Sequence, residues 1–486
     1  MKKITLPFCA FLLLVGCDVL EKEPLPTISP ETFFANADDA ESSLTAAYDA
    51  LQATGYYGQD MNVVGEMPSD NCTSTNGDVA AMEQFIWTPQ TSQVNNIFRD
   101  VYRGINRANA VLAYVPAIDM PEERKNQILG EAHFLRALHY FNLVKLYGAV
   151  PLRLEPTGSG DGNSVSMERA SAEQVYAQVV ADLTQAEAMT AADFGSQVAN
   201  RTRVIKTTVN ALQARVYLTL RQWNDAATAA NKVISSGLYQ LAATPGELYP
   251  PDNNIESIFE VQFSGNEDGG FILPDLLLPS PPATYSFPKF NIPTNELIEQ
   301  YADTVNDARW RFTQETNAGR SHVSYVSSAS SNANDNGYFV YKWNGSPNGF
   351  NSADNYYVLR LADVMLMYAE ASNEAAGPSQ AALDQLNAVR ERADLPALTL
   401  TDLPSQEAFR DEVDRQRRLE LAFEGERWFD LIRYARHETA DGVDHAVTAL
   451  DLIEAQTGTA NADYLLFPIP QTEVNNNALL EQNPGY

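Results

Sequence analysis

Apolar residues recur at helical intervals over much of the chain, and the spacing is clearest in the stretch 203–237. Four apolar residues at intervals of four, three and four lie on one face of a predicted helix: Ile205, Val209, Leu212 and Val216. A second helix is predicted to begin at Trp223 and to end at Gly237, because glycine commonly follows the last helical residue. Tyr217, Trp223 and Ala226 stand where tetratricopeptide-like helix pairs place a large side chain against a small one. The stretch is therefore predicted to be a helical hairpin.

Similar periodicity predicts further helices. Near the N-terminus four residues share one helical face: Leu44, Ala47, Tyr48 and Leu51. The stretch 131–152 is apolar nearly all round, so we expect it to form a helix at the centre of the fold. Five more stretches have helical spacing: 94–115, 172–189, 361–374, 381–393 and 409–436. Strand-like patterns are short and scattered, as in 257–263 and 338–343. The predicted fold class is therefore mostly α.

Long inserts separate these helical stretches. Four of them are rich in Gly, Pro, Ser and Asn: 56–93, 155–170, 264–295 and 313–357. They also carry many aromatic residues, whereas disordered linkers are usually poor in aromatics. We therefore interpret the inserts as ordered loops that cover the helical scaffold or form a site on it.

The N-terminus has the pattern of an export signal. Residues 1–16 begin with two lysines, continue with an apolar run and end in glycine, which is typical of a secretory signal peptide. The sequence LVGC at positions 14–17 resembles the lipobox of bacterial lipoproteins, in which the cysteine is lipidated and becomes the first residue of the mature chain. We expect Cys17 to carry the lipid and residues 17–30 to form a tether. The alternative is an ordinary cleavable signal with an incidental cysteine.

Composition and charge narrow the classes of function. The chain is 44% hydrophobic and 10% aromatic, as in globular proteins, and its net charge is −30. Loss of Lys2 and Lys3 with the signal would take the mature chain to about −32. Such a charge argues against nucleic acid as a partner and against binding flat on an anionic membrane. It suits a neutral or cationic ligand, or serves solubility alone. Cys72 would be the one cysteine left beside Cys17, so no intramolecular disulfide is predicted, and we expect it to be a small packing residue.

No catalytic motif is recognisable, and no cofactor or metal site is predicted. The sequence lacks H-E-x-x-H, G-x-S-x-G, a Walker loop and a Cys/His cluster. His133 and His139 lie on the apolar helix and are expected to be core residues. The stretch 415–434 mixes arginines with carboxylates such as Glu420 and Glu424, which as a pair would suit a glycosidase. Arginines three and four residues away would keep these carboxylates ionised, whereas a general acid needs a raised pKa, so we favour a structural role.

Several segments together resemble one family. The N-terminal half contributes three: SQVNNIFRDVYRGINRANAVL, ILGEAHFLRALHYFNLVKLYGAVPL and TTVNALQARVYLTL. The C-terminal half contributes four: YVLRLADVMLMYAEASNE, LNAVRERADLP, RQRRLELAFEGERWFDLIRY and the closing LLFPIPQTEVNNN with QNPGY. In this order behind a lipobox they resemble the SusD/RagB lipoproteins, outer-membrane partners of TonB-dependent transporters. The resemblance implies a SusD-like N-terminal part over 31–240, a C-terminal part over 241–486, and four tetratricopeptide-like helix pairs that carry a loop-rich ligand region with a few short strands.

A carbohydrate site needs aromatic faces for sugar C–H groups and polar partners for the hydroxyls. Nine candidate residues combine these types on the inserts: Tyr56, Tyr57, Asp70, Asn71, Trp87, Tyr285, Phe287, Trp343 and Asn344. Trp87 is the first choice among them. The alternative for Trp87 is a buried tryptophan that anchors its loop, and packing roles are likewise open for Trp343 and Tyr285.

Three functions are compatible with these patterns. The first is a nonenzymatic surface lipoprotein that captures oligosaccharides and delivers them to a SusC-like TonB-dependent transporter. The second has the same architecture but captures peptides. The third, less favoured, is a glycoside hydrolase. For the first two, the resemblance implies a lipid anchor in the outer membrane with the protein facing the cell exterior.

Overall fold

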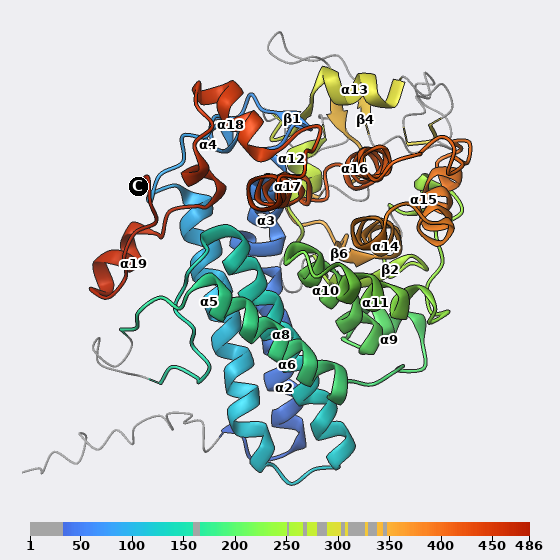
Figure 1. Cartoon of the computed structure of the whole chain (residues 1–486). Coiled ribbons are helices and arrows are strands. Elements are labelled where there is room, and N and C mark those ends of the chain that lie inside the picture. Colours follow the sequence, from blue (N-terminus) through green and yellow to red (C-terminus); the bar gives the residue numbers. More distant parts are fainter. Residues whose placement is uncertain are drawn as a thin grey trace, which may run out of the picture.

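Helices form the frame of the computed structural model (Figure 1), which describes residues 33–486 except 159–165, 250–251, 266–269, 279–288, 303–306, 310–325, 329–337 and 344–347. The N-terminal half contains α2 (Ala37–Asp49), α3 (Asp60–Glu66), α4 (Ala80–Glu83), α5 (Ser92–Tyr114), α6 (Glu122–Tyr147), α8 (Ala172–Met189), α9 (Gln197–Thr202), α10 (Lys206–Thr219) and α11 (Trp223–Ile234). The C-terminal half contains α12 (Leu273–Leu277), α13 (Asn295–Ala302), α14 (Leu361–Ala376), α15 (Gln380–Arg392), α16 (Gln406–Leu421), α17 (Arg427–Asp441), α18 (Ala449–Thr457) and α19 (Gln471–Asn476). The predicted mostly α fold class is confirmed.

Helix α6 lies at the centre of the N-terminal half, as its all-round apolar sequence predicted. It packs against α2, α5 and α8, and nearly all of its residues from Phe134 to Tyr147 are buried. Helix α5 comes very close to it at Gly104, where a Cβ atom would lie only 2.3 Å from Nε2 of His139. Glycine therefore allows the two longest helices to meet along their buried faces.

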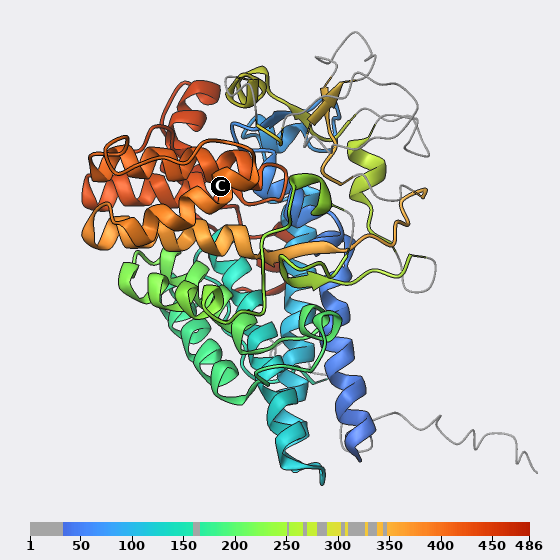
Figure 2. The same ribbon diagram turned by 90° about the vertical axis from the view of Figure 1, so that its right-hand side faces the viewer.

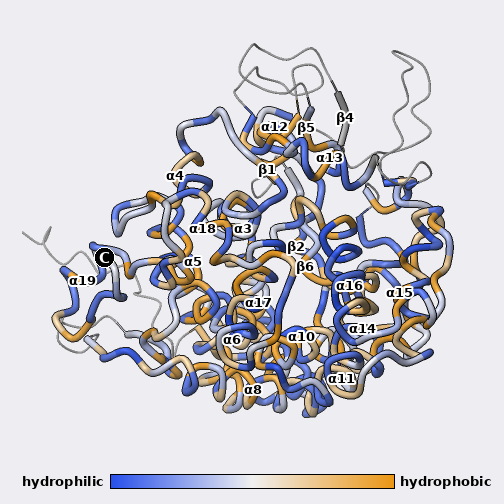
Figure 3. The backbone as a smooth tube through the Cα atoms, turned by 45° about the horizontal axis from the view of Figure 1, so that its top comes forward, coloured by the Kyte–Doolittle hydropathy of each residue, from blue (hydrophilic) through white to orange (hydrophobic). Residues whose placement is uncertain are grey.

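The C-terminal helices form a second group above the first. Figure 2 shows the orange and red helices α14–α17 lying above the green helices α8–α11. Helix α14 joins the two groups because it packs on α10 and α11 on one side and on α15 and α16 on the other. Along most helices hydrophobic and hydrophilic positions alternate (Figure 3), as expected where one face is buried. One continuous hydrophobic core runs from Ala40 to Leu480, so the N- and C-terminal parts share it.

Strands are short and pair across long sequence distances. Strand β2 (Ser257–Val261) runs antiparallel to β6 (Tyr356–Arg360), and β1 (Cys72–Thr73) runs antiparallel to β3 (Ile292–Pro293). Strand β4 (Val326–Ser328) pairs with β5 (Tyr338–Val340). Strand β6 leads directly into α14, with Arg360 as the residue that precedes the helix. The predicted strand-like stretches thus contain β2 and β5.

The prediction of one helical stretch over 409–436 is wrong in one respect. The chain leaves the helix after Leu421 and starts a new helix, α17, at Arg427. Phe423 and Gly425 between them have φ values of 69° and 78°, in the left-handed region that a helix interior does not contain. This loop packs against α3 so tightly that a Cβ on Gly65 would lie 1.9 Å from the carbonyl oxygen of Gly425.

Two smaller expectations concern Cys72 and His133. Cys72 is buried and free, as expected of a packing residue. His133 contacts Asp182 through Nδ1 at 2.7 Å, so it has a partner, but it is only partly buried and not a core residue. Among the described residues, every helix is too short or too polar to cross a bilayer.

His139 makes stability depend on pH. Its Nδ1 lies 3.2 Å from the Tyr56 hydroxyl, Nε2 has no partner among the described residues, and burial lowers the pKa of the imidazole to about 3. The unfolded chain, with an ordinary pKa near 6.5, binds a proton below that pH that the native state does not accept. Stability from neutral His139 is therefore present above pH 6.5 and is lost as the pH falls toward 3. Between pH 7 and 4.5 the loss is roughly 3 kcal/mol.

Chemical denaturation of the wild type and of His139→Gln at both pH values measures this loss. Buried carboxylates with raised pKa values add to the unfolding free energy as the pH falls, but their contribution is the same in both proteins. The difference in unfolding free energy between the two proteins is expected to shift by about 3 kcal/mol in favour of the variant at pH 4.5. Parallel pH profiles would contradict this assignment.

Candidate functional site

Three of the four inserts meet at one end of the molecule. The register of β1 with β3 pairs Cys72 with Pro293, and the Ser74 hydroxyl donates to the Lys289 carbonyl at 3.1 Å. The ammonium group of Lys289 in turn donates to the carbonyl of Tyr338 in β5 at 2.5 Å. We call the described residues of 67–91, 270–302 and 326–356 the cap. Figure 1 shows its elements β1, β4, α12 and α13 together at the top of the view.

A buried carboxylate attaches the cap to the helical scaffold. Glu66, at the end of α3, accepts hydrogen bonds from the backbone N–H groups of Phe423 and Gly425 at 2.9 and 3.1 Å. It also accepts one from the Asn71 amide at 2.8 Å. Burial raises the pKa of Glu66 to about 7 despite these bonds. Glu66 thus connects Asn71 of the cap to the break between α16 and α17.

Asp70 attaches the cap at a second point. It is bound by Arg427 at 2.8 Å and by Arg418 at 3.2 Å. Burial alone would raise the pKa of Asp70, but the two guanidinium groups hold it below its usual value. Because cap and scaffold are joined by charged, hydrogen-bonded groups, the base of the cap is rigid.

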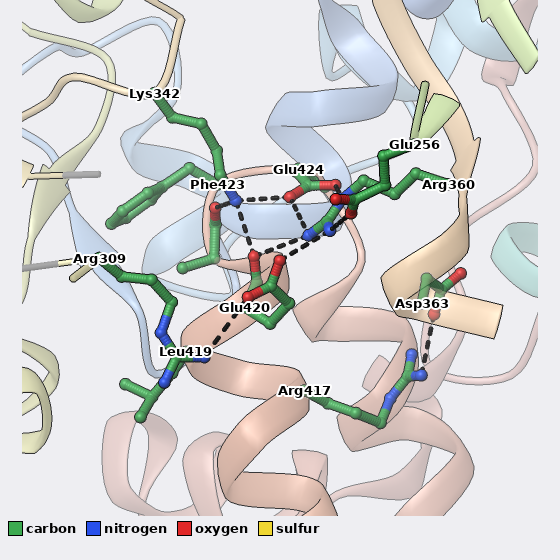
Figure 4. Close-up of polar contacts among 12 residues, drawn as sticks. Glu256, Arg309, Lys342, Arg360, Asp363, Arg417, Leu419, Glu420, Phe423 and Glu424 are labelled. Atoms are coloured by element: carbon green, nitrogen blue, oxygen red, sulfur yellow. Dashed lines mark hydrogen bonds and ion pairs between the residues drawn. The ribbon is translucent and has the colours of Figure 1, made fainter. Parts of the chain in front are cut away.

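Beneath the cap lies a buried ion network (Figure 4). Arg360 binds three carboxylates, Glu256 at 2.8 Å and Glu420 and Glu424 at 2.7 Å each. Lys342 donates to Glu424 at 2.5 Å and to the carbonyls of Glu420 and Ala422 at 2.9 Å. These two carbonyls lie in the last turn of α16 and at the first residue after it, so the network also stabilises the start of the break.

The network decides what Glu420 and Glu424 can do chemically. Burial opposes their ionisation, but Arg392, Arg360 and Arg309 around Glu420 hold its pKa below the usual range. Arg360 and Lys342 do the same for Glu424. A general acid needs a raised pKa, so this pair does not suit glycoside hydrolysis. The expectation that arginines on neighbouring turns of the same helix hold this pair is wrong, because the cations that hold it come from other segments.

Of the six candidate ligand contacts that the structure describes, Asp70 is partly buried and the other five are buried: Tyr56, Tyr57, Asn71, Trp87 and Trp343. The Asn142 amide donates to both Tyr56 and Tyr57, at 2.7 and 2.8 Å. Asn71 accepts from Arg418 at 3.0 Å. Tyr285, Phe287, Asn344 and Cys17 lie outside the described residues.

The two candidate tryptophans lie in separate aromatic clusters. Trp87 donates from Nε1 to the Tyr486 hydroxyl at 2.6 Å and packs edge-on against Phe467. Trp343 stacks on Tyr356 with ring centroids 5.4 Å apart and donates to the carbonyl of Phe423 at 3.0 Å. Both geometries favour the alternative role of loop anchor. Ligand contact by any of the six residues stays a prediction, and it would require their exposure.

An open pocket of about 440 Å³ lies where the cap meets α2 and α5. We call it the base pocket, and its lining includes Gln52, Arg103, Phe263, Gly270, Phe350 and Asn351. Asp275 fixes one wall, because its carboxylate accepts the backbone N–H groups of Asn348 and Phe350 at 2.9 Å each. Phe350 has a φ of 67°, a strained value for a phenylalanine, and such strain is frequent in ligand clamps.

The candidate list did not include the lining of the base pocket. Phe350 lies in the fourth insert and follows a glycine, so the sequence could have indicated this lining residue only as an aromatic on a turn. Gly270 gives a second signal, since a Cβ there would lie 2.2 Å from Cα of Asn351. The sequence alone does not reveal that the third and fourth inserts cross at this glycine.

Comparisons with known proteins decide the family. A model described as "SusD family" matches residues 256–486, and one described as "Starch-binding associating with outer membrane" matches residues 20–218. The chain belongs to the SusD/RagB family. This confirms the resemblance seen in the sequence. Among the described residues of this SusD/RagB chain, no cluster of three or more His, Cys, Asp or Glu side chains is arranged to hold a metal ion.

Named relatives cover nearly the whole SusD/RagB chain. The SusD-like protein P2 of Formosa agariphila is 27% identical, with 100% of both chains aligned. The starch-binding protein SusD of Bacteroides thetaiotaomicron is 24% identical over 89% of this chain and 86% of its own. A solved laminarin-binding SusD-like protein is 25% identical, covers 93% of this chain and 100% of its own, and superimposes with a TM-score of 0.74. The predicted SusD fold is therefore confirmed.

Proposed function

We propose that the protein is a cell-surface lipoprotein that binds glycan nutrients and delivers them to a SusC-like TonB-dependent transporter of the outer membrane. The observation that carries the proposal is the convergence of three aromatic-rich inserts into one cap on a rigid scaffold, in a SusD/RagB chain. The named starch-binding and laminarin-binding relatives support a glycan as the ligand. The lipobox-like sequence ending at Cys17 supports anchoring in the outer membrane.

The base pocket has the chemical groups that a sugar needs. The partly buried ring of Phe350 offers an apolar face to sugar C–H groups, and the buried Phe263 lies in the lining beside it. Arg103 offers hydrogen-bond donors, and its side chain is 54% exposed. Asn351 adds an amide to the lining. The network that keeps Glu420 and Glu424 ionised supports capture without hydrolysis.

Phe350→Ala tests the assignment of the base pocket. Loss of one aromatic face is expected to weaken glycan binding roughly three- to tenfold while the fold stays intact, because the ring is only partly buried. Affinity electrophoresis in gels that contain laminarin or starch measures the effect. Leu400→Ala is the control, since Leu400 is 38% exposed and lies outside the pocket. Equal retardation of Phe350→Ala and the wild type would contradict the assignment.

A further inference from the structure

A second pocket, of about 300 Å³, lies between α5, the described residues 151–157 and Ser166 after α6, and the C-terminal residues around α19, and none of its lining residues belongs to the cap. Figure 1 shows α19 beside this region on the left of the view, whereas the cap is at the top. We call this the lateral pocket. Its lining includes Phe98, Tyr102, Asn106, Pro151, Arg153 and Glu473.

Hydrogen bonds from the helices hold residues 151–153, which form one wall of the lateral pocket. Tyr102 donates its hydroxyl to the carbonyl of Pro151 at 2.7 Å. The carbonyl of Arg153 accepts from the Tyr140 hydroxyl at 2.6 Å and from the Asn109 amide at 3.1 Å. Residues 151–153 are therefore held through their backbone, and the Arg153 side chain is left available. A pocket that is already formed binds a ligand at a lower ordering cost.

The lateral pocket combines an apolar surface with unpaired polar groups. The rings of Phe98 and Tyr102 lie together with centroids 4.7 Å apart, and Tyr102 is the partly exposed one, since Phe98 is buried. Within the described part of the chain, neither the guanidinium group of Arg153 nor the carboxylate of Glu473 has a hydrogen bond or ion pair. Arg99 is different, because it binds Asp100 through two nitrogens at 2.8 and 2.9 Å.

The polar side chains of the lateral pocket include both hydrogen-bond donors and acceptors, and the charges of Arg153 and Glu473 cancel. Arg153 can only donate and Glu473 can only accept, while the Asn106 side chain already accepts from the backbone of Thr157 at 2.7 Å and keeps its amide donors. Sugar hydroxyls donate and accept at once, so they satisfy both kinds of partner. The balanced charge gives no preference for an ionic ligand, and the net charge of −30 on the chain repels polyanions.

We propose that the lateral pocket is a second glycan site, which binds neutral sugar residues between Arg153 and Glu473 against the ring of Tyr102. The proposal rests on glycan capture as the function and adds a site outside the cap. Two sites on one chain engage separate stretches of the same polysaccharide. Binding of the second stretch then occurs at a high effective concentration, which slows release of the polymer.

Calorimetric titration of the mature chain, Asp18–Tyr486, with laminarihexaose and maltohexaose tests the proposal. For the oligosaccharide that binds, two molecules per chain are expected for the wild type and one for Arg153→Ala. The backbone bonds of Arg153 do not involve its side chain, so the variant keeps the loop. Glu473→Gln keeps the shape of the site and is expected to lower its affinity for the oligosaccharide roughly tenfold. Lys206→Ala removes an exposed positive charge elsewhere and is expected to leave two molecules per chain.

The outcomes separate this site from the proposed function. If Arg153→Ala still binds two molecules per chain, the second site is overturned. Tighter binding of an oligogalacturonide than of the neutral oligosaccharide of equal length would also overturn it. One molecule per wild-type chain, lost in Phe350→Ala but kept in Arg153→Ala, overturns the second site and leaves glycan capture intact. If the wild type binds one molecule per chain and only Arg153→Ala loses it, the lateral pocket is the glycan site and the base pocket is not. If no glycan gives heat of binding, both the second site and glycan capture are overturned.

Discussion

Replacing Arg360 by methionine is expected to lower the free energy of unfolding by roughly 3–5 kcal/mol. Arg360 is 1% exposed and is bound to three carboxylates, Glu256, Glu420 and Glu424. Methionine replaces its volume but not its charge, so buried carboxylates lose a partner that solvent cannot replace. Urea denaturation followed by circular dichroism measures the change.

Two further variants show whether charge is the cause. Adding Glu424→Gln to Arg360→Met removes one of the carboxylates left without Arg360 and is expected to restore part of the lost stability. Arg103→Met breaks a contact to Asp100 at 3.3 Å, but the Arg103 side chain is 54% exposed. Its effect is expected to stay within about 1 kcal/mol. A change for Arg360→Met as small as that for Arg103→Met would contradict the structural role of the network.

Replacing Trp87 by alanine is expected to cost roughly 3–5 kcal/mol of unfolding free energy. The indole is 2% exposed and packs against the rings of Phe85, Tyr464 and Phe467. Its loss leaves a cavity between the cap and the C-terminal segment and removes the hydrogen bond to Tyr486. Thermal and urea denaturation measure the change.

The neighbouring residue provides the matched control for Trp87. Ile86 is 60% exposed, so Ile86→Ala is expected to change stability by less than about 0.5 kcal/mol. If Trp87→Ala kept wild-type stability but lost glycan binding, Trp87 would be a ligand contact and not an anchor. The pair of variants therefore separates the two roles that the sequence left open.

Helix periodicity predicted most of the scaffold because it depends on local spacing. The stretch 172–189 is helix α8 with the predicted ends, and the hairpin of α10 and α11 starts its second helix at Trp223 as predicted. The break after Leu421 was missed because its cause is not local. Glu66, more than 350 residues away along the chain, holds the backbone of Phe423 and Gly425. Gly425 was the one local signal of a break.

The site was harder to predict than the scaffold because burial of a loop aromatic depends on distant partners. Trp87 is covered in part by Tyr486, and Trp343 by Tyr356 and Phe423. No spacing in the first or fourth insert reveals those partners. The lateral pocket was missed for the same reason, since Tyr102, Arg153 and Glu473 come together only in the fold. The polar spacing of Arg99, Tyr102 and Asn106 along α5 was visible, but an exposed helix face explains it equally well.

Glycan capture is the central claim, and calorimetric titration of Asp18–Tyr486 with matched panels of neutral oligosaccharides and peptides tests it most directly. Saturable heat with one class of oligosaccharide, at micromolar to millimolar concentration, and none with peptides is the expected result. Heat from peptides together with silence toward every oligosaccharide would contradict glycan capture and would show that this SusD/RagB chain takes peptides as its cargo.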